Sequence, residues 1–176
     1  MIMATNKSIA ARCPIFVNMP LAERAEVLKL LEDECYPAGE VILREGNAVQ
    51  ILWIIVHGQC EVIKTTQNGV EQQLAVLEPG SVFGEMSFFN PAPHSASVRT
   101  LADVQVLRLR RERYDHLQGI CPSAAYRIAA STVAVLAERL RKMDQWTGEL
   151  VEKPGADGHK EEWREFRSKL YSDWKF

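Results

Sequence analysis

The chain has 176 residues, of which 47% are hydrophobic and 25% are charged, so it is long enough for one globular domain and an appendage. Its formal net charge of −2 excludes a bulk electrostatic attraction to nucleic acid or to an anionic membrane. The longest apolar run, Ile51–Val56, is far too short to cross a bilayer. The first residues lack the apolar core of a signal peptide, so we expect a cytoplasmic protein.

The cysteines are widely spread and show neither a C-x-x-C pair nor the cysteine and histidine spacing of a metal site. Reduced thiols that are buried or half-buried are the favoured interpretation, and a structural disulfide or a metal site is the alternative. The four cysteines are Cys13, Cys35, Cys60 and Cys121.

Residues 6–34 have the period of a helical region, with an apolar stripe on one side and charged residues on the other. Pro20, two residues after Asn18, fits the first position of a helix. We therefore predict helices before the first strand. The stripe consists of Leu21, Ala25, Leu28 and Leu31.

Residues 36–110 change to short runs rich in Val, Ile and Leu that are separated by turn signals. Asn68-Gly69 is a strong signal of a two-residue hairpin turn between the runs 62–66 and 72–77. Strands at this spacing, without long helices between them, predict an antiparallel sandwich or barrel. The last strand is expected to place Val104, Val106 and Leu109 in the core and Arg108 and Arg110 outside.

Residues 80–99 combine a strand, a glycine, a short helical turn and a second strand. The first strand ends at Gly84, Glu85 follows, and the turn runs to Asn90 before two prolines break it and a strand covers residues 95–100. Backbone N–H groups at the start of such a turn point in one direction, which suits an anion. Glu85 would repel a phosphate unless its carboxylate reaches past it to sugar hydroxyls.

The period returns to helical at Arg111, and a long helix is predicted over residues 122–146, with Pro122 at its start. Its apolar stripe is wider than a coiled-coil seam. Packing on the barrel and dimerisation through this helix are compatible with each other, and both stay open. The stripe includes Ala125, Ile128, Thr132, Val135, Leu136, Leu140 and Met143.

Residues 147–160 predict a flexible linker, and residues 161–176 predict an amphipathic helix rich in aromatic side chains. So many aromatic residues on one side of a short segment have to be buried somewhere. Docking on the barrel is the favoured interpretation, insertion into a groove of a partner protein is second, and a membrane surface is the least favoured. The residues expected to contact a partner are Trp163, Phe166, Leu170 and Trp174.

Four motifs match the pattern of one known family. Residues 37–42 with Glu45-Gly46 match the entry into its barrel, and residues 54–62 match a hydrophobic hairpin around a glycine. Residues 83–89, Phe-Gly-Glu-Met-Ser-Phe-Phe, match the opening of its phosphate-binding segment, and residues 93–99, Pro-His-Ser-Ala-Ser-Val-Arg, match its end. Through these motifs the chain, over residues 14–117, resembles the cyclic nucleotide-binding domain of catabolite activator proteins, cyclic-nucleotide-dependent kinases and gated channels.

The resemblance implies a fold that is mainly β with flanking helices, an antiparallel β-roll or jelly-roll barrel over residues 36–110 within a domain spanning residues 6–146. It implies that Glu85 accepts a hydrogen bond from the ribose 2′-hydroxyl. It also implies that the backbone N–H groups of Met86 and Ser87, with Ser95, bind the cyclic phosphate. The implied ligand-binding residues are Phe83, Gly84, Glu85, Met86, Ser87, His94, Ser95 and Ser97.

His94 departs from the family pattern because it stands where the family has its phosphate-binding arginine. Arginine offers a permanent charge on a planar fork, whereas histidine is only partly charged near neutral pH. Losing one member of a buried charged pair costs about 2–5 kcal/mol, so weaker nucleotide binding is expected.

Two functions follow from these observations. The first is a stand-alone regulatory module that senses cAMP, cGMP or a related phosphorylated ligand and signals to a partner protein, with a possible homodimer through residues 122–146. The second is a ligand-free interaction or scaffold protein that uses the barrel and the tail. We expect no helix-turn-helix and no DNA binding, because about 30 residues follow Trp146. We expect no enzymatic activity and no metal, because the four histidines are scattered and lack recognisable partners.

Overall fold

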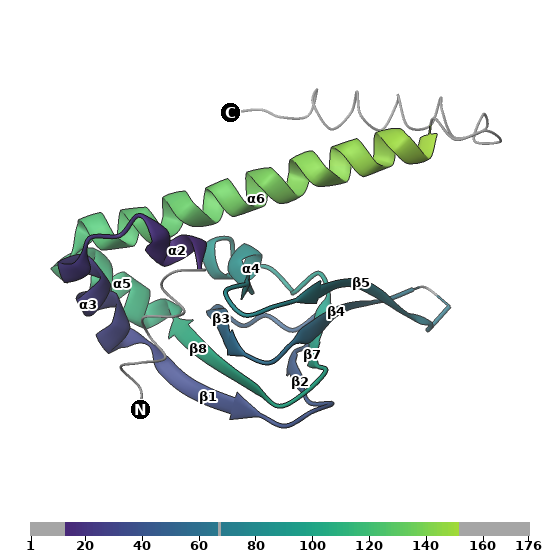
Figure 1. Cartoon of the computed structure of the whole chain (residues 1–176), viewed down its shortest axis with the longest axis horizontal. Coiled ribbons are helices and arrows are strands. Elements are labelled where there is room, and N and C mark those ends of the chain that lie inside the picture. Colours follow the sequence, from purple (N-terminus) through teal and green to yellow (C-terminus); the bar gives the residue numbers. More distant parts are fainter. Residues whose placement is uncertain (1–12, 67, 152–176) are drawn as a thin grey trace. The chain divides into compact units, whose positions relative to one another are not determined.

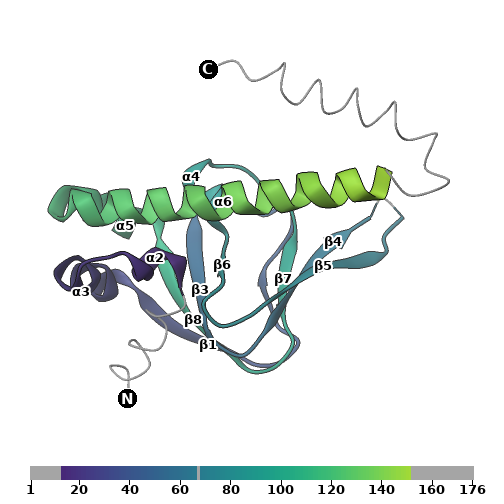
Figure 2. The same cartoon turned by 45° about the horizontal axis from the view of Figure 1, so that its top comes forward.

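The computed structural model describes residues 13–66 and 68–151, and the chain divides into two units, residues 1–132 and residues 133–176. The first unit contains two antiparallel four-stranded sheets, one with the strand order β1-β8-β3-β6 and one with the order β2-β7-β4-β5 (Figure 1). The first sheet consists of β1 (Glu32–Tyr36), β8 (Val104–Arg110), β3 (Ile51–His57) and β6 (Val82–Phe83), which lie side by side in Figure 2. The second consists of β2 (Val41–Leu43), β7 (Ser97–Thr100), β4 (Cys60–Thr65) and β5 (Glu71–Leu77). The predicted β-roll is confirmed.

Strand β3 explains the longest apolar run of the sequence, because it is buried on both faces. Ile51, Trp53 and Ile55 point into the roll, where they join a core with side chains of the second sheet. Leu52 and Ile54 point to the opposite face, where helices cover the sheet. The roll core consists of Leu43, Ile51, Trp53, Ile55, Cys60, Leu77, Phe83, Val98, Val104 and Val106.

Strand β8 is also buried on both faces, which corrects the predicted orientation of its side chains. Val106 lies in the roll core, whereas Leu109 belongs to the core under the helices. Arg108 is opposite Trp53 in the register and so shares the face of Val106 instead of opposing it. Arg108 donates to Glu32 and Glu34 of β1 at 2.6 Å. A half-buried arginine on the inner face is possible because two carboxylates on the neighbouring strand pair with it.

The helices before and after the roll form the second core. They are α2 (Pro14–Val17), α3 (Leu21–Leu30) and α5 (Arg111–Ile120), with the short α4 (Glu85–Phe89) inserted between β6 and β7. Residues 32–34 were predicted to be helical but form the start of β1, paired with β8. Glu32 and Glu34 accept hydrogen bonds from Arg108, and Asp33 accepts from Gln105, so contacts across the strand pair override the local helical period. Residues 6–12 lie outside the described part of the chain.

The last helix, α6 (Pro122–Val151), is longer than predicted and includes the first five residues of the predicted linker. Its first turns contribute Ala124, Ala125 and Ile128 to the core under the helices. In the second unit, Val133, Leu140 and Met143 are exposed on α6. The rest of the linker and the predicted tail helix, with Trp163, Phe166, Leu170 and Trp174, lie outside the described residues. None of the helices in the described ranges combines the length and the apolar character that a membrane span needs.

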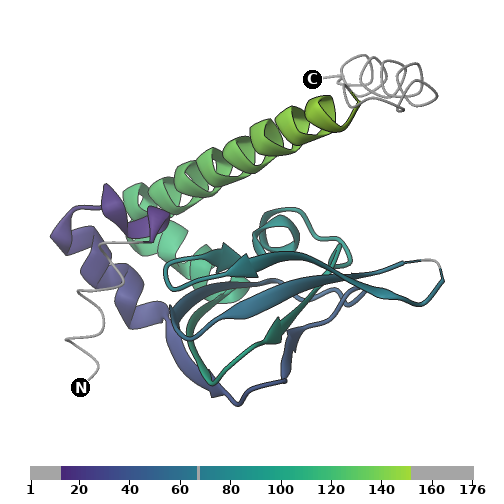
Figure 3. The ribbon, with the colours of Figure 1, turned by 45° about the vertical axis from the view of Figure 1, so that its right-hand side comes forward.

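The hairpin of β4 and β5 extends beyond the other strands of its sheet (Figure 3). The predicted hairpin is present, but its turn is longer than the predicted two-residue turn, because Thr66 N donates to Val70 O at 2.9 Å. Gly69 has a φ of 78°, and its N–H donates to Thr66 O at 2.9 Å. Strand β5 is the edge of the sheet and is exposed along most of its length. The far end of the hairpin therefore extends away from the roll, whereas Cys60 and Leu77 at its base belong to the roll core.

Candidate functional site

Gly84 makes the sharp change of direction from strand β6 into helix α4. Its φ of 78° lies in the left-handed region that favours glycine. A Cβ atom at this position would lie 2.6 Å from the carbonyl oxygen of Ile51 and equally close to the ring of Trp53. Gly84 also accepts the first hydrogen bond of the helix, from Phe88 N at 3.1 Å. The N–H groups of Met86 and Ser87 lie in the first turn, ahead of the first donor of the helical hydrogen-bond series, which is Phe88 N.

Two aromatic side chains fix α4 to the two cores of the first unit. Phe83, just before the helix, is stacked on Trp53 in the roll core with ring centroids 5.3 Å apart. Phe88, inside the helix, is fully buried and makes edge contacts with Phe89 and Tyr114. The short helix therefore needs no intrinsic stability, since packing on both sides holds it in place.

The three residues that open α4 differ in their exposure. The side chains of Glu85 and Ser87 are buried, with 4% and 3% of their surface exposed, whereas Met86 is 58% exposed. A buried carboxyl and a buried hydroxyl in the same helical turn are groups that bind sugar hydroxyls and phosphate oxygens. The roles that the family resemblance implies for this turn stay a prediction.

His94 lies in the same buried environment and contacts α4 directly. Its Nδ1 is 2.8 Å from the Ser87 hydroxyl oxygen, and only 6% of the residue is exposed. Its main chain is bonded on both sides, since Gly46 N donates to His94 O and His94 N donates to Asn47 O, both at 2.9 Å. Its Nε2 is buried and has no hydrogen-bond partner among the described residues. Burial lowers the pKa of the imidazole, because the charged form loses its hydration.

Ser95 and Ser97 are near one another in sequence but have different surroundings. Ser95 is exposed, and its carbonyl oxygen accepts a hydrogen bond from Lys64 Nζ at 2.6 Å. The Ser97 hydroxyl accepts a hydrogen bond from Glu45 N at 2.9 Å, so it helps to join β7 to the loop after β2. The structure therefore brings Ser87 and His94 together, while Ser97 is engaged with the loop.

Lys64 is a charged residue beside the site that the sequence did not indicate. It comes from β4, and its ammonium group contacts Glu45 at 2.5 Å as well as the Ser95 carbonyl. The Lys64 ammonium lowers the pKa of the Glu45 carboxyl by a direct hydrogen bond. Its position depends on the pairing of β4 with β7, so no local sequence signal could have identified it. Arg99, by contrast, pairs with Glu61 and Glu71 on the same sheet.

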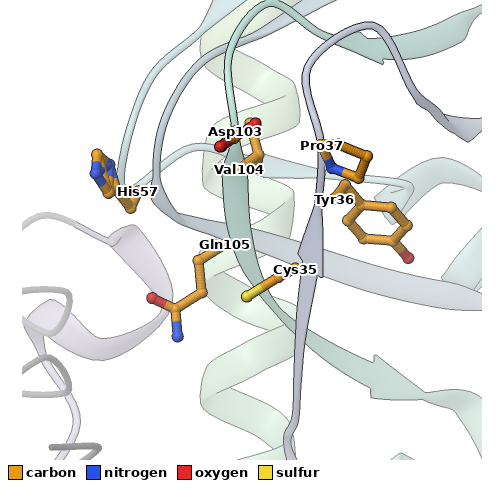
Figure 4. A pocket seen from close by; sticks show the side chains of 7 residues that line it. All are labelled: Cys35, Tyr36, Pro37, His57, Asp103, Val104 and Gln105. Carbon is orange, nitrogen blue, oxygen red and sulfur yellow. The ribbon is translucent and has the colours of Figure 1, made fainter.

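A separate pocket of about 470 Å³ opens at the ends of strands β1, β3 and β8 (Figure 4). The side chains of Cys35 and Gln105 lie on one side of the neighbouring strands, whereas the ring of Tyr36 lies on the other. None of the predicted ligand residues lines this pocket, and within the described ranges no cluster of three potential metal ligands exists. Its lining residues are Cys35, Tyr36, Pro37, His57, Asp103, Val104 and Gln105.

The sequence profile described as "Cyclic nucleotide-binding domain" matches residues 33–118, which include the roll, α4 and His94. The Cyclic AMP receptor protein of Thermus thermophilus is 34% identical over 131 residues, which are 74% of this chain and 59% of that protein. A CRP-like cAMP-activated global transcriptional regulator of Mycobacterium tuberculosis is 28% identical over 81% of this chain and 62% of its own length. A cAMP-dependent protein kinase regulatory subunit of Pyricularia oryzae is 30% identical over 60% of this chain and 26% of its own length.

Solved structures agree with the sequence relatives. The Thermus thermophilus Catabolite Activator Protein superimposes with a TM-score of 0.69 at 33% identity, covering 78% of this chain and 62% of that one. A cyclic nucleotide-binding domain from Methylobacillus flagellatus shares the fold with a TM-score of 0.73 at 22% identity, covering 85% and 86% of the two chains. This chain therefore belongs to the family of proteins with a cyclic nucleotide-binding domain. It spans about 60% of the length of the transcription regulators and about a quarter of the kinase subunit.

Proposed function

We propose that this chain is a regulatory module that binds a cyclic nucleotide, cAMP or cGMP, and reports its occupancy to a partner protein. The observation that supports this most directly is the buried contact between Ser87 and His94. It joins the two ends of the segment that the matched family uses for phosphate binding. The three sequence relatives described above are named for cAMP, which makes cAMP the first ligand to test.

In this proposal, a carboxylate, two backbone N–H groups and a hydroxyl bind the ligand. The Glu85 carboxylate accepts the ribose 2′-hydroxyl, and the N–H groups of Met86 and Ser87 donate to the cyclic phosphate. Ser95, exposed next to His94, adds its hydroxyl to the phosphate. Phe83 and Gly84 act indirectly, because they place α4 against the roll core.

The experiment is a calorimetric titration of the full chain with cAMP, cGMP and a cyclic dinucleotide up to near-millimolar concentration. We expect weak heat with a cyclic mononucleotide. The His94→Arg variant is expected to bind at least about 30-fold more tightly, because a fixed cation in a buried pair contributes about 2 kcal/mol or more. The exposed His116 on α5 offers the matched control, and His116→Gln should leave the affinity unchanged.

A second function, a ligand-free interaction protein, is supported by the same histidine. His94 is already hydrogen-bonded to Ser87, and its lowered pKa favours the uncharged imidazole at neutral pH. His94 therefore does not offer a phosphate the permanent charge of an arginine. Absence of heat and of a thermal shift with every nucleotide, for the wild type and for His94→Arg, would favour this alternative. It would contradict the sensing function.

The partner surface in this proposal is the exposed apolar side of α6. Val133, Leu140 and Met143 follow one another at spacings of seven and three residues, which places them on one side of the helix. A homodimer or a partner helix would bury them. Light scattering of the full chain should report a dimer that Leu140→Glu converts to a monomer. If the wild type is monomeric at high concentration, the homodimer is excluded, and a partner protein would bind the exposed apolar side of α6.

A further inference from the structure

Hydrogen bonds fix the main chain and Nδ1 of His94, whereas its Nε2 has no hydrogen-bond partner among the described residues. The main chain of the loop after β2 clamps the residue on both sides, and Ser87 of α4 holds Nδ1 at 2.8 Å. The edge of the imidazole approaches Trp53 of β3, with ring centroids 6.4 Å apart. The buried Nε2 has no partner in the described part of the chain. Buried polar atoms of native proteins are normally hydrogen-bonded, so this atom calls for a ligand group or water.

The Ser87 hydroxyl is compatible with both protonation states of this ring. It donates to Nδ1 when the proton of the neutral imidazole is on Nε2, and it accepts from Nδ1 when that nitrogen carries the proton. In the imidazolium form both nitrogens donate, so Nδ1 still bonds to Ser87 while Nε2 offers an N–H to an anion. Protonation of His94 therefore requires only a rotation of one hydroxyl group and breaks none of the hydrogen bonds that fix His94.

Acidic, basic and uncharged residues lie on the elements that surround His94. Glu85 on α4 is a buried acidic residue, and Glu45 in the clamping loop is offset by Lys64 of β4. Arg44 at the start of the same loop is exposed, and β3 contributes Trp53, which has no charge. A phosphate monoanion beside His94 would bring a negative charge into a buried environment. Its burial is favourable only if a positive charge is taken up with it.

We propose that this chain binds a cyclic mononucleotide together with one proton, and that His94 holds this proton as an imidazolium whose Nε2–H donates to the phosphate. The inference rests on the proposed function and adds to it a response to pH: the module is a sensor of the nucleotide that responds more strongly in an acidic environment. The bond that forms is Nε2–H to a phosphate oxygen, and the proton comes from solvent. Because the free imidazole is neutral at pH 7, each bound nucleotide takes up its proton on binding.

The test is calorimetry of the full chain with cAMP between pH 5.5 and 8.5, in two buffers of different ionisation enthalpy. Between the pKa of the free imidazole and its raised pKa in the complex, the dissociation constant should rise by roughly tenfold per pH unit. The buffer dependence of the heat should give proton uptake approaching one per nucleotide. An NMR titration of the imidazole signals in the wild type should show that cAMP raises the pKa of His94, which is a readout independent of any variant.

Two variants separate His94 from other titrating groups. His94→Arg carries a permanent charge, so its affinity should be nearly independent of pH over this range and its proton uptake near zero. His116→Gln, at an exposed position, should reproduce the pH dependence of the wild type. Thermal unfolding of each variant shows whether it is folded at the pH of the titration.

The outcomes distinguish this inference from the proposed function. Wild-type binding that is independent of pH and takes up no proton would overturn the inference and leave nucleotide sensing standing. Binding by His94→Arg alone would also overturn it, because it would mean that His94 cannot replace the cation. No binding by either protein at any pH would overturn both the inference and the proposed function.

Discussion

Replacement of Gly84 by alanine is the sharpest test of how the roll positions the candidate site. An alanine at a φ of 78° costs about 1–2 kcal/mol because its Cβ is crowded by the backbone. Its methyl group would lie 2.6 Å from the Ile51 carbonyl oxygen and from the Trp53 ring, and relief of such overpacking costs about 1–3 kcal/mol. The smaller entropy of the unfolded alanine chain offsets about 0.4–1 kcal/mol. We expect Gly84→Ala to lower the free energy of unfolding by about 2–4 kcal/mol.

Gly69 is the matched control, because it has the same φ of 78° and an added Cβ would meet nothing within 4 Å. Gly69→Ala should lose about 1 kcal/mol or less, since only the backbone strain and the unfolded-state term apply. Urea unfolding followed by circular dichroism and by tryptophan fluorescence measures both variants. Equal stabilities of the two variants, within about 0.5 kcal/mol, would refute the idea that close packing against β3 requires a glycine at the start of α4.

Three further predictions concern buried groups of the first unit. Burial raises the pKa of the Cys13 and Cys60 thiols to about 11, so at pH 8 a thiol reagent should label the exposed Cys35 long before either. Mass spectrometry of the labelled peptides would contradict this if the three rates were similar. The buried Thr100 hydroxyl donates to a backbone C=O at 2.6 Å and accepts from a backbone N–H at 2.8 Å. Thr100→Val should therefore lower the free energy of unfolding by about 1–3 kcal/mol. An unchanged stability in urea unfolding would refute a stabilising role of these two hydrogen bonds. His94 has a lowered pKa in the folded chain, so stability should fall as pH drops below about 6.5, where the unfolded imidazole takes up its proton first. His94→Gln should remove that part of the pH dependence in thermal unfolding, and an unchanged slope would contradict the assignment.

Local patterns of the sequence determined the strands, several turns and the main features of the site segment. The apolar run of β3 had to be buried, and the structure buries both of its faces. Asn68-Gly69 specified a hairpin because glycine adopts a positive φ without strain. Gly84 followed by an acidic residue specified the passage from strand to helix for the same reason. These features are predictable because each depends on the conformational preferences of a few consecutive residues.

Other features depended on contacts between distant segments. Residues 32–34 have a helical period but pair with β8. Arg108 of β8 donates hydrogen bonds to Glu32 and Glu34, which lie about 75 positions earlier in the chain. The inward face of Arg108 follows from the same pairing. A local period cannot reveal such contacts, since the strand register is fixed by the whole sheet.

The chemistry of the candidate site depends both on local sequence patterns and on contacts between distant segments. The sequence by itself predicted, through the family resemblance, that a histidine stands where the family has an arginine, and that a glycine and an acidic residue open a segment similar to the family's phosphate-binding segment. Only the tertiary structure decided that Ser87 contacts the His94 ring, that Nε2 has no hydrogen-bond partner among the residues that the structure describes, and that Lys64 pairs with Glu45. The physical reason is that the charge and hydrogen bonding of a side chain depend on its neighbours in space, and folding brings these neighbours from separate strands and helices.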